Sequence, residues 1–483
     1  MDEKMNGKTM EIHSNITTVH GVNNLRKKQR NHNVWCALML ANVIITVAYL
    51  IIIKNKYNND HIVTRINANC KINQVPFPSV TICNVNLVSN KRSKTIADIL
   101  KSNNVTQTEV QLFLQNLPDL KEYRKLKANQ YDFSKELGIL KRHYFTVESV
   151  MEEVHQTCED LLLHCSFNRK AKDCSELFRM IKTYEGHCCA FNYAALNDDT
   201  VDSADDDDDI ERYDDESENE QSSNIIVTSE SGRGSGLSVI LNVEPDDYGK
   251  WSLVPFYGAK ILVCDPNDYP EVTVLYKYIG IGVSVDIKVE PMIFQSDDEI
   301  RRIDVKKRGC IFHDEGLLEH TDRYSTETCI TECRMKIFFT NCGCIPYKYP
   351  KERETRICEF KDLECLNKFR GNIHCTQACY MECRDKRYTI TSDVMPLVAD
   401  FYPYDVINDH NLSEITTLQV YFDKSTCNCY KQMLLMDLSY FIATYGGIFS
   451  LSFGASLLTC FEIFYLFTKF MMKYLWRKLK ENR

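Results

Sequence analysis

The sequence predicts a membrane protein of the α+β class, in which two transmembrane helices flank a large, disulfide-rich extracellular domain. Two uncharged apolar runs, Val34–Ile53 and Leu438–Phe461, are each long enough to cross a hydrocarbon core of about 30 Å as a helix. No segment between them is comparably apolar. That interval holds all of the 22 cysteines except Cys36 and Cys460. This clustering indicates an oxidising compartment, where disulfides persist.

The charges beside the two runs predict their orientation. Basic residues crowd the outer ends of both runs: Arg26, Lys27, Lys28 and Arg30 before the first, and Lys469, Lys473, Arg477, Lys478 and Lys480 after the second. The positive-inside bias then places residues 1–33 and 469–483 in the cytoplasm and makes this a multi-pass protein of the plasma membrane. A cleaved signal peptide is the competing interpretation of the first run. Its charged leader is long for a signal peptide, however, the apolar run exceeds an h-region, and no A-x-A-like site follows.

Residues 54–437 are therefore predicted to form one continuous extracellular domain. Zinc binding is a weaker explanation of its cysteines than disulfides, because Cys342-x-Cys344 and Cys427-x-Cys429 lack the spacing and the partner histidines of zinc ribbons. We therefore expect no metal site. Sequons at Asn104 and Asn411 are predicted to carry glycans, whereas the sequon at Asn15 would lie in the cytoplasm.

An acidic tract, residues 198–220, dominates the net charge. It contains 14 acidic residues against the single Arg212, more than the net charge of −9 of the whole chain. Such a run repels itself and buries no apolar surface, so we predict a disordered, solvated insertion. The tract lacks the alternating ligands and turn glycine of an EF-hand loop. A long-range field that concentrates cations or attracts a partner is the alternative role.

The periodicity between the runs predicts a mixture of strands and helices. Strand-like runs occur at Ser79–Cys83, Leu237–Val243, Lys260–Val263, Ser284–Val289 and Thr417–Phe422, and we expect one sheet that leads into both spans. Helical patterns occupy Thr95–Leu117, Ser149–Leu163 and Thr326–Phe338. Within this region the pairs Cys329/Cys333 and Cys375/Cys379 each place two sulfurs on one helical face, so two antiparallel helices are candidates for a pair of disulfide rungs. Spacing alone leaves the connectivity open.

Several motifs together resemble the degenerin/epithelial sodium channel superfamily over nearly the whole chain. They are Thr18-Val19-His20-Gly21, the segment Phe77 to Asn84, Cys189-Ala190-Phe191-Asn192, Gly446-Gly447 and Gly454-Ala455-Ser456. Three further motifs look most like the insect pickpocket branch: Cys188 to Asn192, Arg308-Gly309-Cys310 with Asp314-Glu315, and Gly258 to Val263 followed by Asp265-Pro266.

The resemblance implies a trimeric channel, homomeric or heteromeric, whose extracellular domain has palm, finger, knuckle, β-ball and thumb regions. Matching the order of the cysteines implies seven bridges: Cys83–Cys189, Cys165–Cys174, Cys310–Cys383, Cys329–Cys379, Cys333–Cys375, Cys342–Cys365 and Cys344–Cys358, with residues 310–383 as the thumb ladder. Cys264 has no partner in this scheme. Because Cys70 follows the first span and Cys427 and Cys429 precede the second, we expect one further bridge there. Cys158 is expected to pair with Cys188.

Small residues form one helical face of the second span: Ser439, Ala443, Gly447, Ser450 and Gly454. On periodicity alone this face favours helix packing over pore lining, because small-xxx-small stripes are common in helix dimers. The resemblance reverses that preference. It implies that residues 438–468 form the pore helix and that Gly454, Ala455 and Ser456 leave regular helix as a selectivity filter, where backbone carbonyls replace part of a cation's water shell.

Other residues acquire roles from the resemblance. Ala443, Gly446, Gly447 and Ser450 are the expected pore and gate positions, His20 and Gly21 the gating motif, and Asp437 and Glu462 the charges that bracket the pore. Without the resemblance, His20-Gly21 indicates only a turn. Snorkelling to water is the alternative role of the two acidic residues, since both lie near the ends of the span.

The function these observations favour is a sodium-permeable, amiloride-sensitive cation channel subunit that needs no cofactor besides the permeant Na⁺ and binds no nucleic acid. Force, protons and an extracellular ligand, whether a peptide or a small molecule, remain open as stimuli, and so does constitutive activity. Val305-Lys306-Lys307-Arg308 stands where acid-sensing relatives carry a Pro-Trp pair, which disfavours proton gating. His313, His320 and His374 are candidates for titration near neutrality, although an exposed histidine in a large extracellular domain is more often incidental. A two-span receptor, adhesion protein or non-conducting accessory subunit, or an ATP-gated channel, are the alternatives. An extracellular enzyme is disfavoured, because the sequence has no G-x-S-x-G or H-E-x-x-H motif.

Overall fold

The structure is a computed structural model that describes residues 32–59, 62–123, 133–195, 225–249, 255–321, 323–350, 355–370, 375–398, 411–435 and 438–481. The chain divides into two compact units. Unit 1 is Met1–Thr64, Asp297–Arg302 and Gln432–Arg483, and unit 2 is Arg65–Ser296 and Ile303–Lys431. The acidic tract, His20, Gly21, His374 and Asp437 lie outside the described residues.

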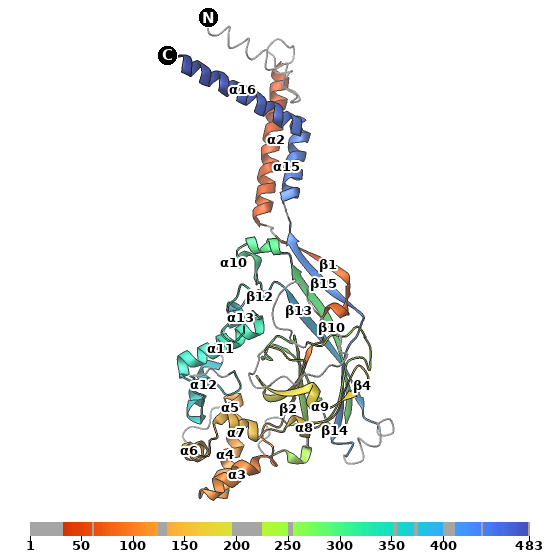
Figure 1. Cartoon of the computed structure of the whole chain (residues 1–483), viewed down its shortest axis with the longest axis vertical. Coiled ribbons are helices and arrows are strands. Elements are labelled where there is room, and N and C mark those ends of the chain that lie inside the picture. The colour runs from red at the N-terminus through yellow and green to blue at the C-terminus, as the bar shows by residue number, and fades with distance from the viewer. Residues whose placement is uncertain are drawn as a thin grey trace. The chain divides into compact units, whose positions relative to one another are not determined.

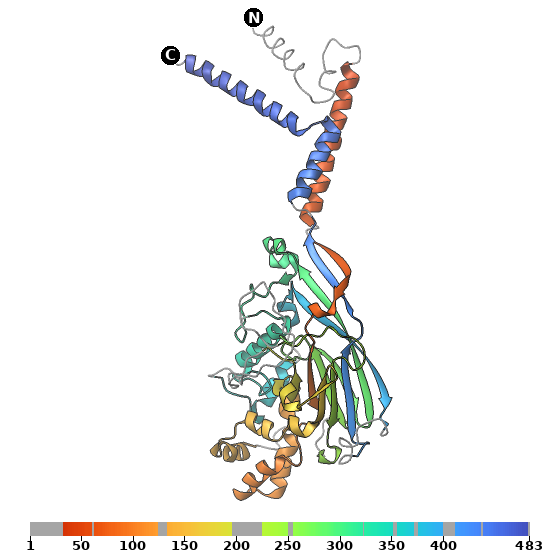
Figure 2. The same ribbon diagram turned by 45° about the vertical axis from the view of Figure 1, so that its right-hand side comes forward.

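Unit 1 is built from three long helices: α2 (His32–Asn59), α15 (Leu438–Phe453) and α16 (Leu457–Glu481). Helices α2 and α15 lie side by side in both views (Figures 1 and 2). Helix α16 turns away from α15 by 76°. Among the described residues, only α2 is long and apolar enough by itself to cross a membrane, over Asn33–Lys56. The pair α15 and α16 meets that standard only if it is taken as one broken segment.

Unit 2 contains an eight-stranded sheet with the order β1-β15-β10-β14-β7-β3-β4. The eighth strand, β13, pairs with β10 on the edge opposite β14. Its strands are β1 (Ile62–Lys71), β3 (Leu162–Phe167), β4 (Lys170–Lys172), β7 (Leu237–Asn242), β10 (Val283–Ser296), β13 (Asp385–Pro396), β14 (Ile415–Phe422) and β15 (Thr426–Leu434). The ends of β1 and β15 belong to unit 1, where the chain continues from α2 and into α15.

A second, five-stranded sheet has the order β5-β6-β2-β8-β9. It consists of β2 (Ser79–Asn84), β5 (Phe178–Thr183), β6 (Gly186–Phe191), β8 (Gly258–Cys264) and β9 (Leu275–Gly280). The prediction of one sheet is therefore wrong, because two of the five predicted strands, β2 and β8, lie in this smaller sheet. The two sheets share one apolar core. At its centre, the ring of Phe77 meets Phe167 of β3 at 5.4 Å and Phe191 of β6 at 5.8 Å between centroids.

A separate apolar core lies among the helices of unit 2. These are α3 (Ser93–Ser102), α4 (Gln107–Asn116), α5 (Asp119–Glu122), α6 (Ser134–Arg142), α7 (Val147–Glu153), α11 (Thr326–Cys342) and α12 (Leu363–Arg370). The other helices of unit 2 are short: α8 (Cys158–Leu161), α9 (Cys174–Leu177), α10 (Val305–Arg308) and α13 (Cys375–Ala378). Strands β11 (Cys310–Ile311) and β12 (Met381–Glu382) pair apart from both sheets.

Capping residues explain where the helices depart from prediction. The pattern Thr95–Leu117 is divided into α3 and α4, because Asn104 has φ +63° and Thr106 caps α4 in a capping box with Glu109. The pattern from Ser149 to Leu163 stops as a helix at Glu153 and resumes only briefly in α8. Helix α11 runs past the predicted end to Cys342, where Gly343 adopts φ +66° as its C-cap.

Eight disulfides hold unit 2 together, and six of them are the pairs Cys165–Cys174, Cys310–Cys383, Cys329–Cys379, Cys333–Cys375, Cys342–Cys365 and Cys344–Cys358. Two of these bridges join α11 to α13, as the helical spacing of their cysteines suggested. Among the described cysteines, the expected bridge from Cys70 to Cys427 or Cys429 is not formed. All three are buried thiols.

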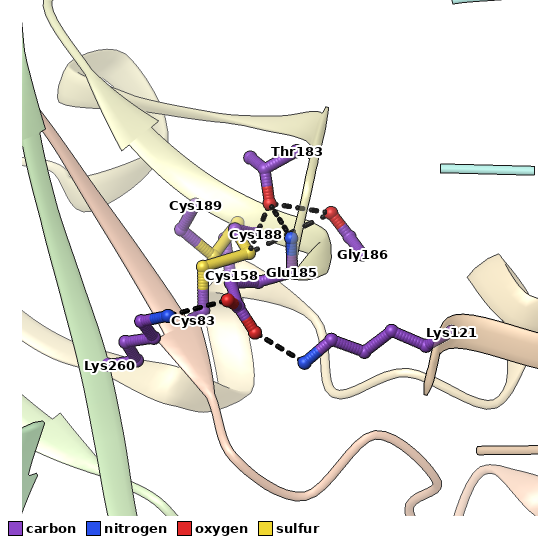
Figure 3. Close-up of a disulfide and its surroundings, with 9 residues drawn as sticks. All are labelled: Cys83, Lys121, Cys158, Thr183, Glu185, Gly186, Cys188, Cys189 and Lys260. Atoms are coloured by element: carbon purple, nitrogen blue, oxygen red, sulfur yellow. Dashed lines mark hydrogen bonds and ion pairs between the residues drawn. A yellow bond between two sulfur atoms is a disulfide. The ribbon is translucent and has the colours of Figure 1, made fainter. Parts of the chain in front are cut away.

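The expected bridge Cys83–Cys189 is wrong, and so is Cys158–Cys188. The structure joins Cys83 to Cys188 and Cys158 to Cys189 (Figure 3). The register of β2 and β6 places Ile82 opposite Cys189, so the next pair along is Cys83 opposite Cys188, with Cα atoms 4.6 Å apart. Successive side chains of a strand point to opposite faces, which leaves Cys189 directed away from Cys83.

An ion-pair network lies beside this bridge (Figure 3). Glu185, between β5 and β6, accepts hydrogen bonds from Lys260 of β8 at 2.6 Å and from Lys121 of α5. Burial raises the pKa of the Glu185 carboxyl, but the charges of the two lysines outweigh burial and lower it to about 2. The network therefore ties α5 to the five-stranded sheet at every pH of physiological interest.

Candidate functional site

The segment Gly454-Ala455-Ser456 interrupts the helix between α15 and α16. Gly454 ends α15 with φ +62°, a left-handed conformation that glycine adopts without steric cost. Its N–H donates to Ser450 O at 2.8 Å, which is the hydrogen bond of a left-handed C-cap. The sequence thus encodes the end of α15 locally.

Ser456 begins α16 as its N-cap. The Ser456 hydroxyl accepts from Thr459 N at 3.3 Å, and Ser456 N donates to the Thr459 hydroxyl at 3.2 Å. This reciprocal pair corresponds to a capping box with threonine in place of glutamate. A C-cap glycine and an N-cap serine therefore stand two residues apart. The helix stops and restarts within one short segment.

A helix end of this kind releases backbone oxygens. The last four carbonyls of an α-helix have no partner within the helix, and glycine and alanine offer no large side chain to cover them. One of the four in α15, Ser452 O, accepts a hydrogen bond of 2.6 Å from Asn42 Nδ2 of α2. The Thr46 hydroxyl lies 2.9 Å from the Ser452 hydroxyl and donates to Asn42 O at 2.8 Å.

Asn42 and Thr46 are functional candidates that the sequence interpretation missed. They are two polar residues four positions apart in an apolar run, so both fall on one face of α2. Thr46 is 3% exposed, although most of α2 is exposed. Polar side chains within a membrane helix find partners on a neighbouring helix, and that rule is the signal that could have found them.

The predicted small-residue face of α15 is largely open. Ser439, Ala443, Gly447 and Ser450 are exposed, and Gly454 is half-buried. A Cβ atom built at Gly446 or Gly447 meets nothing within 4 Å. The small face therefore does not serve the contact between α2 and α15 within one chain. Glu462 is half-buried in α16, beyond the break.

A cluster of carboxyl groups surrounds the beginning of α11. Asp268 accepts from the Ser325 hydroxyl at 2.5 Å, and Glu382 accepts from Thr326 N at 2.8 Å. Burial, followed by the charge of Asp385, raises the pKa of Glu382 to about 8. Burial, followed by the charges of Glu382 and Asp265, raises the pKa of Asp268 well above its ordinary value. These side chains hold protons at a pH where exposed carboxyls are ionised.

The expectation of titration near neutrality is wrong for His313. Burial and the nearby charge of Arg323 lower the pKa of His313 to about 4, so His313 stays neutral at physiological pH. His320 lies 3.1 Å from Glu332. Among the described residues, Glu382 is one group whose pKa lies nearer neutrality, and Lys348 is another, because burial lowers its pKa to about 7. Composition alone reveals neither shift.

Comparison with known proteins places this geometry in a family. The family model described as "Amiloride-sensitive sodium channel" matches residues 14–466. The chain belongs to the amiloride-sensitive sodium channel family. This family consists of ion channels rather than enzymes, and its channels assemble as oligomers of related subunits.

The similar proteins agree with the pickpocket branch. The chain is 25% identical to the sodium channel protein Nach of Drosophila ananassae over 95% of this chain and 86% of that protein. It is 26% identical to pickpocket protein 28 of Drosophila melanogaster, over 94% and 77% of the two chains. The bile acid-sensitive ion channel of Rattus norvegicus is 22% identical over 96% and 88%.

Proposed function

We propose that this family member is a pore-forming subunit of a sodium-permeable, amiloride-sensitive channel in the plasma membrane. The segment from α15 to α16 forms a second span, so both basic ends of the chain face the cytoplasm. Three subunits, identical or related, surround one axis. The observation that carries the proposal is a helix break at Gly454-Ala455-Ser456 at the end of an exposed, small-residue face.

The physical role of each part follows from the geometry. The small face of α15 is left open within the subunit, so neighbouring copies can approach closely and enclose a narrow path. At the break, backbone oxygens rather than bulky side chains meet that path, and oxygen ligands favour alkali cations over anions. Non-helical backbone at membrane depth is tolerated where it lines such a cavity. Asn42 and Thr46 hold the last turn of α15 against α2 and thereby position the break.

The experiment is expression of the full chain in oocytes, alone and together with a pickpocket relative, with surface protein measured by biotinylation. The proposal predicts an amiloride-blocked current whose reversal potential moves with external Na⁺. A current only upon co-expression indicates a heteromeric channel. Absence of current in both settings, with the subunit present at the surface and a conducting relative as positive control, contradicts a pore-forming role and favours a receptor or accessory protein.

A further inference from the structure

Three cysteine thiols gather where β1 pairs with β15. Cys70 lies near the end of β1, and Cys427 and Cys429 lie two residues apart in β15, so both point to the same face of that strand. Ile72 N, directly after β1, donates to Ser425 O, directly before β15, at 3.3 Å, which brings Cys70 close to Cys427 across the strand pair, and all three cysteines belong to the same apolar core. All three are buried and belong to none of the eight disulfides.

Two of the three thiols donate to neutral side-chain amides, and the charge of Lys431 acts on Cys429 as well. The Cys70 thiol donates to Gln74 Oε1 at 3.6 Å, and the Cys429 thiol donates to Gln295 Oε1 at 3.7 Å. Cys264, the remaining buried thiol of unit 2, lies apart from this cluster and donates to Asp268 O at 3.9 Å. Clustering with a second and a third thiol therefore distinguishes Cys70, Cys427 and Cys429 from Cys264.

An odd number of adjacent thiols has a chemical consequence. In an oxidising compartment two neighbouring thiols form one disulfide, and the third remains within reach of it. Cys70 is the shared member, because it alone lies on β1, opposite the strand that carries the other two cysteines. We propose that Cys70, Cys427 and Cys429 form one thiol–disulfide exchange site, in which Cys70 is bonded in turn to Cys427 and to Cys429 after oxidation by a low-molecular-weight disulfide.

The reaction balances without any further reactant. A thiolate of Cys70 attacks one sulfur of the small disulfide and expels a small thiolate. The thiolate of Cys427 or Cys429 then attacks the Cys70 sulfur of the mixed disulfide and expels the second small thiolate. Two protein thiols are oxidised, the small disulfide is reduced to two thiols, and the two protein protons pass to them.

Exchange then proceeds inside the protein with no net oxidation. The remaining cysteine of β15 attacks the Cys70 sulfur as a thiolate and releases the other cysteine of β15. Burial raises the pKa of Cys427 to about 12 and also raises that of Cys429, so exchange is slow at neutral pH and accelerates as the pH rises. The bridge moves by two residues, about 7 Å along the strand.

The exchange site lies on the two strands that lead to the proposed membrane spans. Strand β1 continues directly from α2, and β15 leads directly towards α15. Each of the two bridges ties a different residue of β15 to Cys70 and so adds its own constraint on the register between the strands that lead to the two proposed spans. Reduction leaves that register to the backbone hydrogen bonds of the strand pair alone.

The test is disulfide mapping of the full-length protein, purified from the cell surface and incubated with oxidised glutathione at pH 8. Free thiols are alkylated under denaturing conditions, and peptide fragmentation between Cys427 and Cys429 identifies the partner of Cys70. We expect both bridged isomers in the wild-type protein, with one alkylated cysteine of the three. Cys427→Ser and Cys429→Ser should each retain a bridge to Cys70, and Cys70→Ser should leave both cysteines of β15 alkylated. The variant Cys264→Ser is the matched control, with both isomers unchanged.

Two results overturn the proposal. If the wild-type protein shows a single isomer, and only one of the two serine variants of β15 retains a bridge, the site holds a fixed disulfide. If all three cysteines are alkylated after oxidation, the site does not react. The eight other disulfides, mapped in the same digest, report whether each variant has folded, and the wild-type isomer ratio does not depend on any variant.

Discussion

Asn42 of α2 donates its side-chain amide to the main-chain oxygen of Ser452, two residues before the left-handed Gly454. The contact joins residues that are 410 positions apart in the chain. It fixes one of the carbonyls that the end of α15 would otherwise leave without a partner. The geometry of the break therefore depends on both α2 and α15, and a substitution on α2 is expected to change the geometry of the predicted filter.

Replacing Asn42 tests this dependence. Asn42→Leu removes the donor, and we expect the current to fall and the Na⁺/K⁺ permeability ratio to shift, since a hydrogen bond between membrane helices contributes about 1 to 2 kcal/mol. Reversal potentials at matched surface expression are the measurement. Ile44→Leu, at an exposed position of the same helix, is the control and should behave as wild type. Equal permeability ratios for both variants would show that the contact does not position the filter.

Gly454 should tolerate no side chain. Its φ of +62° costs a residue with a Cβ atom about 1 to 2 kcal/mol, so Gly454→Ala should distort the break and alter permeability ratios or amiloride block. Gly138→Ala is the matched control, because Gly138 lies in helix α6 of unit 2 with open space around its Cβ position. Dose–response curves for amiloride and ion substitution measure both variants. A filter role for Gly454 is excluded if its variant conducts and matches the control in both respects.

Enlarging Ala443 should hold the pore open. Ala443 lies on the exposed small face, where neighbouring subunits approach in the proposed trimer. A larger side chain there disfavours close packing of the α15 helices in the closed pore. We expect Ala443→Val to raise the amiloride-sensitive resting current several-fold. Thr444→Val is the control: it changes the next, half-buried side chain without enlarging the small face, so its resting current should match wild type. An unchanged resting current in oocytes with equal surface protein would contradict the gate assignment.

The raised pKa of Glu382 predicts a pH-dependent stability. Below pH 4.5 the folded and unfolded states both bind the proton, whereas between about 4.5 and 8 only the folded state keeps it, so the free energy of unfolding falls as the pH rises. Glu382→Gln removes the ionisable group and with it this loss of stability at higher pH. The variant should gain about 2 kcal/mol or more over wild type at pH 8 and little at pH 5. Melting temperatures of the detergent-solubilised protein across this range are the measurement.

The control for that experiment is Asp98→Asn, which replaces an exposed carboxylate of α3. Its difference from wild type should stay small and constant with pH, since exposed charges contribute little. A constant difference for Glu382→Gln as well would mean that Glu382 is ionised in the folded protein throughout the range.

Local signals in the sequence predicted more of this structure than long-range pairing did. The predicted strand segments and α11 are present because their period and caps are properties of neighbouring residues. The assignment of β2 and β8 to a separate sheet depends on which strands meet, and no periodicity contains that information. The exchange of Cys188 and Cys189 as partners has the same origin. Adjacent cysteines differ only in the face of β6 to which they point, and register decides that face.

The same difference between local signals and long-range pairing holds for the candidate site. The apolar run and its small residues were evident in the sequence, and the break at Gly454 follows from a C-cap glycine beside an N-cap serine. The contact of Asn42 with Ser452 and the carboxyl cluster around Glu382 join distant segments. Their pKa shifts and hydrogen bonds arise only after folding, so the sequence indicated His313 instead.

Substituted-cysteine accessibility tests the central claim most directly. In a conducting assembly with Cys36 and Cys460 replaced by serine, Ser450→Cys places a thiol on the small face, and Leu451→Cys places one on the adjacent, 91% exposed position that points elsewhere on α15. Our account predicts that a charged methanethiosulfonate reagent blocks the Na⁺ current of Ser450→Cys, that amiloride slows this block, and that Leu451→Cys is unaffected. If the reagent blocks the current of Leu451→Cys and leaves the current of Ser450→Cys unchanged, this face of α15 does not line the cation path.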